Sequence, residues 1–275
     1  MSMRKFAIAF AVAISALPAM ATCSAGSPVI ENGYRQMYNL DFATAHKTFT
    51  AYEEQHPDDP LPHVSNAAAY LFAEFDRMHV LEIELFADNS HFEKRQKVAA
   101  DPAVKDAFEK ELAVSDGIAM RRLANSPNDA EALFAQILAN GLRGDYEALI
   151  EKKNLASLSY MKASRGKAEQ LLTLDPNCYD AYLAVGVENY LLGINPAPVR
   201  WVLRLTGAET DKKDGIEKLQ LTAAKGDYLA PFARLLLAVA AVREKDPQRA
   251  RELLSGLAAE FPQNHLYAAQ LSRIH

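Results

Sequence analysis

Histidines and closely spaced carboxylates are the residues of this chain whose types could support metal binding or proton transfer. Five of the seven histidines fall in the first hundred residues, namely His46, His56, His63, His79 and His91. None of them stands at the HExxH spacing or at another ligand spacing from a nearby carboxylate. Glu82 and Glu84 are two positions apart, so a helix would direct them to different sides. The sequence therefore predicts no metal site and no catalytic histidine.

The sequence also lacks the motifs of nucleotide-binding and nucleophilic enzymes. It contains no glycine-rich phosphate loop, no G-x-S-x-G elbow and no Ser/Lys motif. We therefore expect a binding protein without a cofactor rather than an enzyme.

The single tryptophan, Trp201, lies in a segment, 194–211, that interrupts the predicted helices. Residues 198–205 could form a short amphipathic helix with Arg200 and Arg204 one turn apart. One hypothesis is that Trp201 contacts a membrane surface or a partner protein. The other is that this helix lies across its neighbours and buries the tryptophan between them.

Composition indicates an all-α protein with an excess of negative charge. Of the 275 residues, 49% are hydrophobic, which is enough for a sizeable core in one elongated domain or two. Alanine and leucine abound, while the alternating Val, Ile and Thr runs expected of strands are missing. The 35 acidic residues outnumber the 30 basic ones. This balance argues against nucleic acid as a partner and against a polybasic contact with anionic lipid.

The first 21 residues have the features of a cleaved export signal. Arg4 and Lys5 precede an apolar run, 6–17, and residues 19–21 have the small-x-small pattern that signal peptidase cuts. This run is too short to span a bilayer stably. Its removal leaves 28 basic residues against 35 acidic ones, a net charge of −7. We expect a mature protein in the periplasm or outside the cell.

The two cysteines, Cys23 and Cys178, form no C-x-x-C or Cys/His ligand pattern. Cys23 follows the cleavage site, so lipidation at Cys23 is the alternative, and only this modification would bring the protein to a membrane. A lipoprotein signal has a small residue where Thr22 stands and usually leucine where Met20 stands. In an oxidising compartment the two cysteines could pair, but a flexible terminus is expected at Cys23. We therefore expect Cys178 to be an unpaired, partly buried thiol.

Hydrophobic periodicity, caps and prolines predict a series of helices with two insertions. The predicted helices are residues 29–40, 41–55, 61–87, 102–123, 129–143, 146–174, 178–192, 212–225, 228–244, 246–260 and 264–273, with insertions at 88–101 and 194–211. The run 146–174 has no breaker except Gly166, so we expect one long helix there. The chain thus divides into a signal peptide (1–21), a linker (22–32) and one helical domain (33–275).

A helix-ending motif that contains a proline occurs four times. The four copies are QHPDD (55–59), NSPND (125–129), LDPNC (174–178) and FPQNH (261–265). Proline disfavours helix at the residue before it and can open the helix that follows. Each motif therefore predicts the end of one helix and the start of another.

The first and last of these motifs share a pattern in the helix before the proline. Alanine stands twelve residues before it (Ala45, Ala250), and a bulky apolar residue stands eight before it (Phe49, Leu254). This pattern resembles the tetratricopeptide repeat, a helix-turn-helix unit of about 34 residues. Proline spacings of 70, 49 and 86 residues fit pairs of units with insertions. The resemblance implies a right-handed α-solenoid of about five hairpins with a C-terminal capping helix, 264–273.

The stretch from Tyr179 to Tyr228 carries a second resemblance. After Pro176, Tyr182 and Gly186 stand where the tetratricopeptide repeat has an early aromatic and a small residue. The stretch then contains LLG, a proline-aromatic insert, DKKDG and AAKGDY. It is similar to secreted bacterial tetratricopeptide-repeat proteins of undefined role, so it implies export but no particular ligand.

In tetratricopeptide repeats the first helix of each hairpin lines a concave groove. The resemblance assigns to this groove Glu131, Phe134, Leu138, Asp180, Leu183, Val187 and Tyr190. Such a largely apolar wall suits the side chains of a protein or peptide partner, unless the insertions or the long helix fill it. We therefore expect an exported scaffold that binds a protein or peptide partner in the bacterial envelope. The alternative is a small-ligand-binding accessory protein, like the T-component of TRAP solute transporters.

Overall fold

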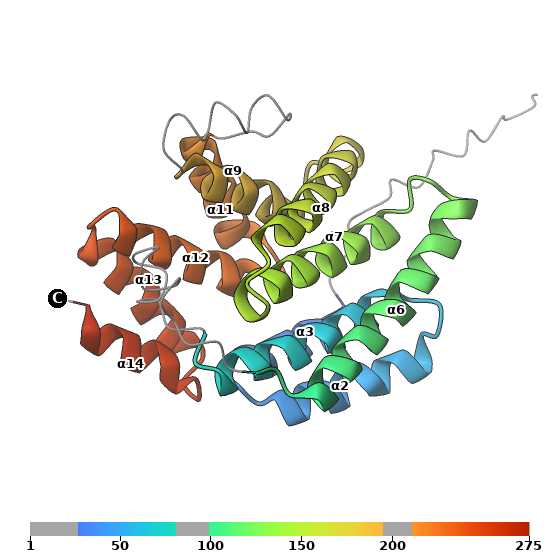
Figure 1. Cartoon of the computed structure of the whole chain (residues 1–275), viewed down its shortest axis with the longest axis horizontal. Coiled ribbons are helices and arrows are strands. Elements are labelled where there is room, and N and C mark those ends of the chain that lie inside the picture. Colours follow the sequence, from blue (N-terminus) through green and yellow to red (C-terminus); the bar gives the residue numbers. More distant parts are fainter. Residues whose placement is uncertain (1–26, 81–98, 195–210, 275) are drawn as a thin grey trace, which may run out of the picture.

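The computed structural model describes residues 27–80, 99–194 and 211–274, and all regular structure in these ranges is helical (Figure 1). The α-helices are α1 (Pro28–Tyr38), α2 (Phe42–Gln55), α3 (Leu61–Arg77), α6 (Pro102–Asn125), α7 (Ala130–Asp145), α8 (Asn154–Leu174), α9 (Tyr182–Gly193), α11 (Lys212–Lys225), α12 (Ala230–Arg243), α13 (Pro247–Glu260) and α14 (His265–Arg273). A π-helical turn, Tyr146–Ile150, follows α7, and a 3-10 turn, Tyr179–Ala181, precedes α9. The predicted all-α fold is confirmed, and α1 begins within the residues expected to be a linker.

Acidic side chains explain where several helices begin. Asp41, Asp101, Asp129 and Asp246 each accept a hydrogen bond from a backbone N–H in the first turn of the following helix. This satisfies one of the donors that every helix start leaves unpaired. The four proline motifs lie at the ends of α2, α6, α8 and α13, as predicted.

Helices adjacent in sequence pack as five pairs: α1 with α2, α3 with α6, α7 with α8, α9 with α11, and α12 with α13. The second helix of each pair carries a small buried residue eleven positions before its C-cap residue. These residues are Ala45, Ser115, Ser164, Gly215 and Ala250. A small side chain lets the partner helix approach closely. The common spacing indicates one repeated unit, including the α9/α11 pair, whose second helix ends without a proline.

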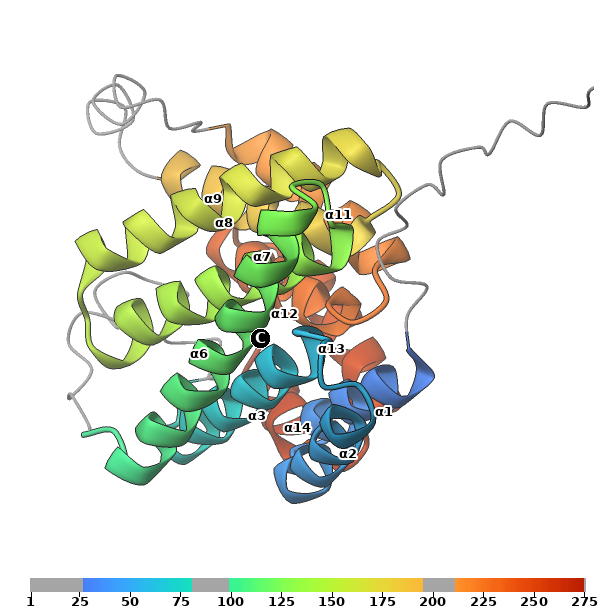
Figure 2. The same ribbon diagram turned by 90° about the vertical axis from the view of Figure 1, so that its right-hand side faces the viewer.

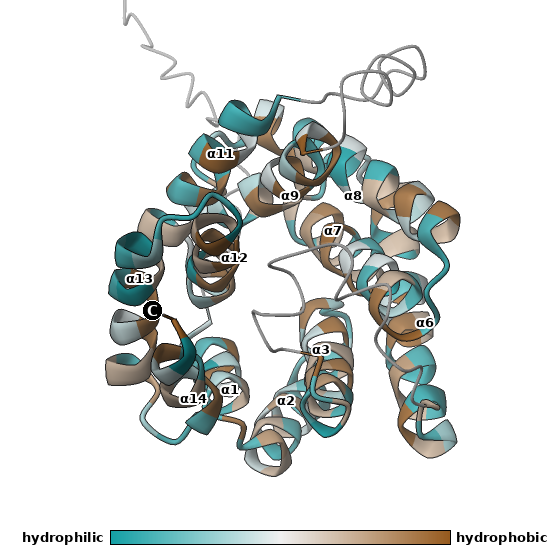
Figure 3. Ribbon diagram, turned by 60° about the vertical axis from the view of Figure 1, so that its left-hand side comes forward, coloured by the Kyte–Doolittle hydropathy of each residue, from teal (hydrophilic) through white to brown (hydrophobic). Residues whose placement is uncertain are grey.

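The five pairs follow one another around a ring (Figure 3). The first helix of each pair, which we call an inner helix (α1, α3, α7, α9 and α12), faces the enclosed space. Hydrophobic residues of α3, α7 and α12 lie on this side of the ring. α14 packs on α13 at the end of the series.

Contacts between α1 and the C-terminal helices close the ring (Figure 2). The Tyr38 hydroxyl donates a hydrogen bond of 2.9 Å to the Tyr228 carbonyl, just before α12. The Asn264 side-chain amide donates one of 2.8 Å to the Tyr38 carbonyl. The rings of Tyr38 and Phe261 pack with centroids 5.5 Å apart. The first and last hairpins therefore meet, which they would not do in an open stack.

Two predicted helices are shorter than expected. The run 146–174 is not one helix, because the π-helical turn ends at Ile150 and α8 begins only at Asn154. Between them Lys152 has φ of 58°, in the left-handed region, which interrupts the helix. α3 likewise ends at Arg77 instead of continuing to 87, and residues 81–98 lie outside the described ranges.

Cys178 is buried and disulfide-bonded, so the expectation of an unpaired thiol is wrong. The other cysteine of the sequence, Cys23, lies outside the described residues. The same is true of the expected signal peptide, 1–21, and of Trp201.

Candidate functional site

The inner helices surround a cavity of about 260 Å³. Each of them contributes apolar side chains to the wall, including Met37 from α1, Phe72 from α3, Leu142 from α7, Leu183 from α9 and Phe232 from α12. The rings of Phe72 and Phe232 meet across the space with centroids 5.5 Å apart. The apolar wall and the size of the cavity are those of a site for a small hydrophobic molecule.

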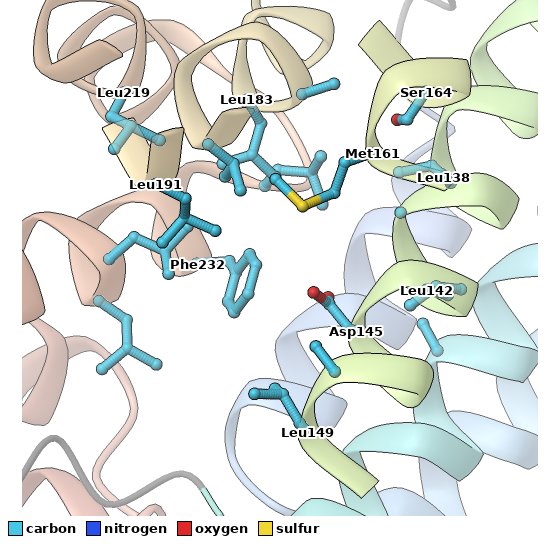
Figure 4. Close-up of a pocket in the computed structure, with 18 of the residues that line it drawn as sticks. Leu138, Leu142, Asp145, Leu149, Met161, Ser164, Leu183, Leu191, Leu219 and Phe232 are labelled. Atoms are coloured by element: carbon cyan, nitrogen blue, oxygen red, sulfur yellow. The ribbon is translucent and has the colours of Figure 1, made fainter. Parts of the chain in front are cut away.

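Asp145, the last residue of α7, places a carboxyl group in this apolar wall. Figure 4 shows the group pointing into the cavity, between Leu149 and Met161 and facing Phe232. Within the described part of the chain it makes no hydrogen bond or ion pair, and no neighbouring charge contributes to its titration. Burial among apolar groups raises the pKa of Asp145 from 3.8 to about 7, because it disfavours the charged form.

The π-helical turn after α7 accounts for the position of this carboxyl group. Leu138, Leu142, Asp145 and Leu149 follow one another at intervals of four, three and four residues, so they share one helical face. The helix continues past Asp145 as the wider π turn instead of ending there. π-helical turns of this kind are frequent at functional sites.

Two other polar groups of the wall, Asp180 and Ser164, have structural partners. Asp180 accepts hydrogen bonds from the backbone N–H groups of Asp227, Tyr228 and Leu229, at 3.2, 2.9 and 3.1 Å. Burial nevertheless raises the pKa of Asp180 to about 6. The Ser164 hydroxyl donates to the Ile137 carbonyl at 2.8 Å. These groups hold helices together, in contrast to Asp145.

A second, more polar space adjoins the cavity beside α9 and α12. It has a volume of about 350 Å³ and shares Tyr190, Ile194 and Arg243 with the cavity wall. Lys212 and Glu244 form an ion pair of 2.9 Å on its other side. The Tyr190 hydroxyl is buried without a hydrogen-bond partner in the described residues, and burial raises its pKa to about 12. The two adjoining spaces form an apolar chamber with a polar end.

One group of side chains on the outside of the ring contains residue types that can bind a metal ion. Glu53, His63 and Glu111 bring their ligand atoms within 4.8 Å of one another, between α2, α3 and α6. His63 Nδ1 lies 2.8 Å from a Glu111 carboxylate oxygen and 3.5 Å from one of Glu53. Burial alone would lower the pKa of His63, but the hydrogen bond to Glu111 and the charge of Glu53 raise it above 6.5. A protonated His63 bridging two carboxylates accounts for the group without a metal.

The structure separates the expected groove residues into three kinds of position. Leu183, Val187 and Tyr190 line the cavity, as do Leu138 and Asp180. Phe134 is buried in the core, with its ring 6.3 Å from that of Tyr228. Glu131 is exposed and forms an ion pair of 2.7 Å with Arg122.

Asp145 is the residue that the sequence interpretation missed. The predicted helix ended at 143, because Gly144-Asp145 has the composition of a turn. The signal that could have identified it is the periodicity of the apolar face, which runs through position 145 to Leu149. A lone carboxylate within such a face is a candidate functional group.

No helix in the described ranges is both long enough and apolar enough to cross a membrane. Comparisons of the chain with protein-family models, with curated proteins and with solved structures found no match.

Proposed function

We propose that this chain is an exported solenoid of tetratricopeptide type, closed on itself, that carries a small apolar ligand in its central cavity. The five hairpins with a small residue at one common position support the repeat assignment. The inner position of the first helix in every pair supports it further, since tetratricopeptide units present this helix on their concave side.

The observation that carries the proposal is an almost wholly apolar cavity lined by helices of five different hairpins. A protein or peptide partner, the first expectation, needs a groove that it can enter along its length. The Phe72–Phe232 contact instead spans this space, and the hydrogen bond from Tyr38 to Tyr228 joins the first hairpin to the start of α12. This favours the alternative, a small-ligand-binding accessory protein, and binding rather than catalysis.

The disulfide at Cys178 supports a place for the protein in the periplasm or outside the cell, because disulfides persist in oxidising compartments. It agrees with the export signal expected at 1–21. The acidic composition supports a partner other than nucleic acid.

Gly141 offers a direct test of ligand binding. It lies on α7 in the cavity wall, and a Cβ added there would have no atom within 4 Å. Gly141→Phe should therefore fill the cavity without a clash and replace a helix-weakening glycine. Gly166→Phe is the matched control, since Gly166 is exposed on α8 with equally open space around its Cβ.

The readout is the fluorescence of the neutral apolar dye N-phenyl-1-naphthylamine, titrated into the purified full chain. We expect saturable binding that Gly141→Phe weakens by about tenfold or more, corresponding to about 1.4 kcal/mol, and that Gly166→Phe leaves unchanged. Unaltered melting temperatures would assign the loss to the filled cavity. Equal binding by both variants, or no binding by the parent protein, would overturn the proposal.

A further inference from the structure

The cavity contains a carboxyl group that the fold does not use. Asp145 has no hydrogen-bond or ion-pair partner in the described residues, while Asp180, the other carboxylate of the wall, is held by three backbone N–H groups. Asp145 also stands near the C-terminal end of its helix, where the helix dipole disfavours negative charge. The folded protein therefore gains no stability from a carboxylate at this position.

From this position we propose that Asp145 selects the ligand, and that the ligand is an amphiphile with an apolar body and one protonated amine that pairs with the Asp145 carboxylate. This inference rests on the proposed carrier function and defines its ligand class. An ionised carboxylate in an apolar wall loses its hydration and regains it only through a partner of opposite charge. An ammonium group supplies that charge together with a short, charge-assisted hydrogen bond.

The rest of the wall fits a ligand of this kind. Side chains drawn around Asp145 in Figure 4, among them Leu149, Met161 and Phe232, are apolar and suit an apolar body. Arg243 lines the same cavity but makes no contribution to the titration of Asp145, so it does not neutralise the carboxylate. A ligand with a negative head group would instead meet like charge at Asp145 and is disfavoured.

The charge state of Asp145 makes amine binding depend on pH. Its pKa is about 7, whereas an alkyl amine remains protonated across the neutral range. The ion pair therefore forms fully above about pH 7 and is lost as the pH falls and the carboxyl group takes up a proton. The other titratable groups that face the cavity are Tyr34, Tyr38, Asp180, Tyr190 and Arg243. Of these, only Asp180 titrates near this range, with a pKa of about 6.

Three ligands with the same dodecyl chain separate the head-group effect from that of the cavity. Dodecylamine, dodecanol and dodecanoate are each titrated below micelle formation against the bound dye. The proteins compared are the full chain, Asp145→Asn, and Asp106→Asn, an exposed acid on α6 that serves as the matched control. Asp145→Asn should melt at the same temperature as the parent protein or higher, because it removes an unpaired charge from the apolar wall.

We expect the parent protein to bind dodecylamine about tenfold or more tightly than dodecanol at about pH 8, the gain of a charge-assisted hydrogen bond. Asp145→Asn should lose this preference and bind dodecanol as before, while Asp106→Asn should keep it. In the parent protein the preference should also disappear towards about pH 5.5, with dodecanol binding unchanged as the control for Asp180.

Two results would overturn the inference in distinguishable ways. Equal binding of amine and alcohol by the parent protein, or an amine preference that survives in Asp145→Asn, would reject the role of Asp145 and leave the carrier proposal standing. Binding of none of the three ligands would reject both the role of Asp145 and the carrier proposal, because the apolar cavity would then bind no ligand.

Discussion

The hydroxyl of Tyr38 in the first hairpin donates a 2.9 Å hydrogen bond to the backbone carbonyl of Tyr228, 190 residues later in the chain. This buried bond joins the two ends of the helical series at the point where α12 begins. Because α1 and α12 both line the cavity, the bond also fixes one part of its wall. A ring of helices closed in this way has a defined interior volume.

Tyr38→Phe should therefore weaken the contact between α1 and the start of α12 that closes the ring. The change removes the hydrogen bond that the Tyr38 hydroxyl donates to the Tyr228 carbonyl, so we expect the free energy of unfolding to fall by about 1–3 kcal/mol. Urea denaturation followed by circular dichroism measures this loss. Tyr179→Phe is the control, because the Tyr179 hydroxyl bonds to Asn177 at the surface. Equal free energies of unfolding for the two variants would show that the Tyr38–Tyr228 hydrogen bond does not stabilise the fold.

The contact between α9 and α11 gives a second prediction. A Cβ on Gly215 would lie 2.5 Å from the backbone nitrogen of Tyr190, and one on Gly186 would lie 3.0 Å from the Gly215 carbonyl oxygen. Gly215→Ala should separate the two helices and cost about 1–3 kcal/mol. Gly256→Ala, in open space on α13, should instead stabilise by roughly 0.5–1 kcal/mol. Thermal melting should show a lower melting temperature for Gly215→Ala and a higher one for Gly256→Ala. Shifts in the same direction would contradict the close approach of α9 and α11.

Features of the fold that depend on residues close together in the sequence could be predicted. Features that depend on residues far apart in the sequence could not. The proline motifs act locally, so the ends of α2, α6, α8 and α13 were predictable. Helical periodicity predicts that Leu171, Tyr182 and Gly186 are buried; this is confirmed for Leu171 and Gly186, whereas Tyr182 is partly exposed. Ring closure depends on Tyr38 meeting Tyr228, a pairing that no local pattern encodes.

The candidate site was predictable only in part for a similar reason. Leu183, Val187 and Tyr190 lie on an inner helix, and the repeat register places them on the cavity side. The same register also selected Phe134, whose surroundings are set by Tyr228 from a distant helix. Asp145 was missed because Gly144-Asp145 has the composition of a turn, which predicts the end of the helix. In the structure α7 includes Asp145 and is followed directly by the π-helical turn.

The outer cluster around His63 gives a prediction for pH. Its pKa lies above the ordinary 6.5, so the protonated form is favoured in the folded state. The stabilisation from His63 is therefore fully present below pH 6.5 and is lost as the pH rises through the raised value. Urea unfolding of the parent protein and His63→Gln should show a stability difference that shrinks from about pH 6 to about pH 8. His265→Gln, at an exposed histidine on α14, should show no such trend. A difference that grew with pH would contradict the charged bridge to Glu53 and Glu111.

Mass spectrometry of protein from the envelope tests export and the state of Cys178. We expect a mature chain that begins near Thr22, with Cys178 resistant to alkylation until a reductant is added. A diacylglycerol increment on Cys23 would instead establish lipidation. A chain that begins at Met1 in the cytoplasm would contradict the export proposal.

The central claim is that the space between the inner helices holds a ligand. The most direct measurement is photolabelling of the full chain with a diazirine-bearing dodecylamine, followed by peptide mapping. We expect labelled residues on the cavity side of α3, α7, α9 and α12, and loss of the label in Gly141→Phe but not in Gly166→Phe. Labels confined to the outer helices α2, α6 and α13, or labelling that Gly141→Phe leaves intact, would contradict it.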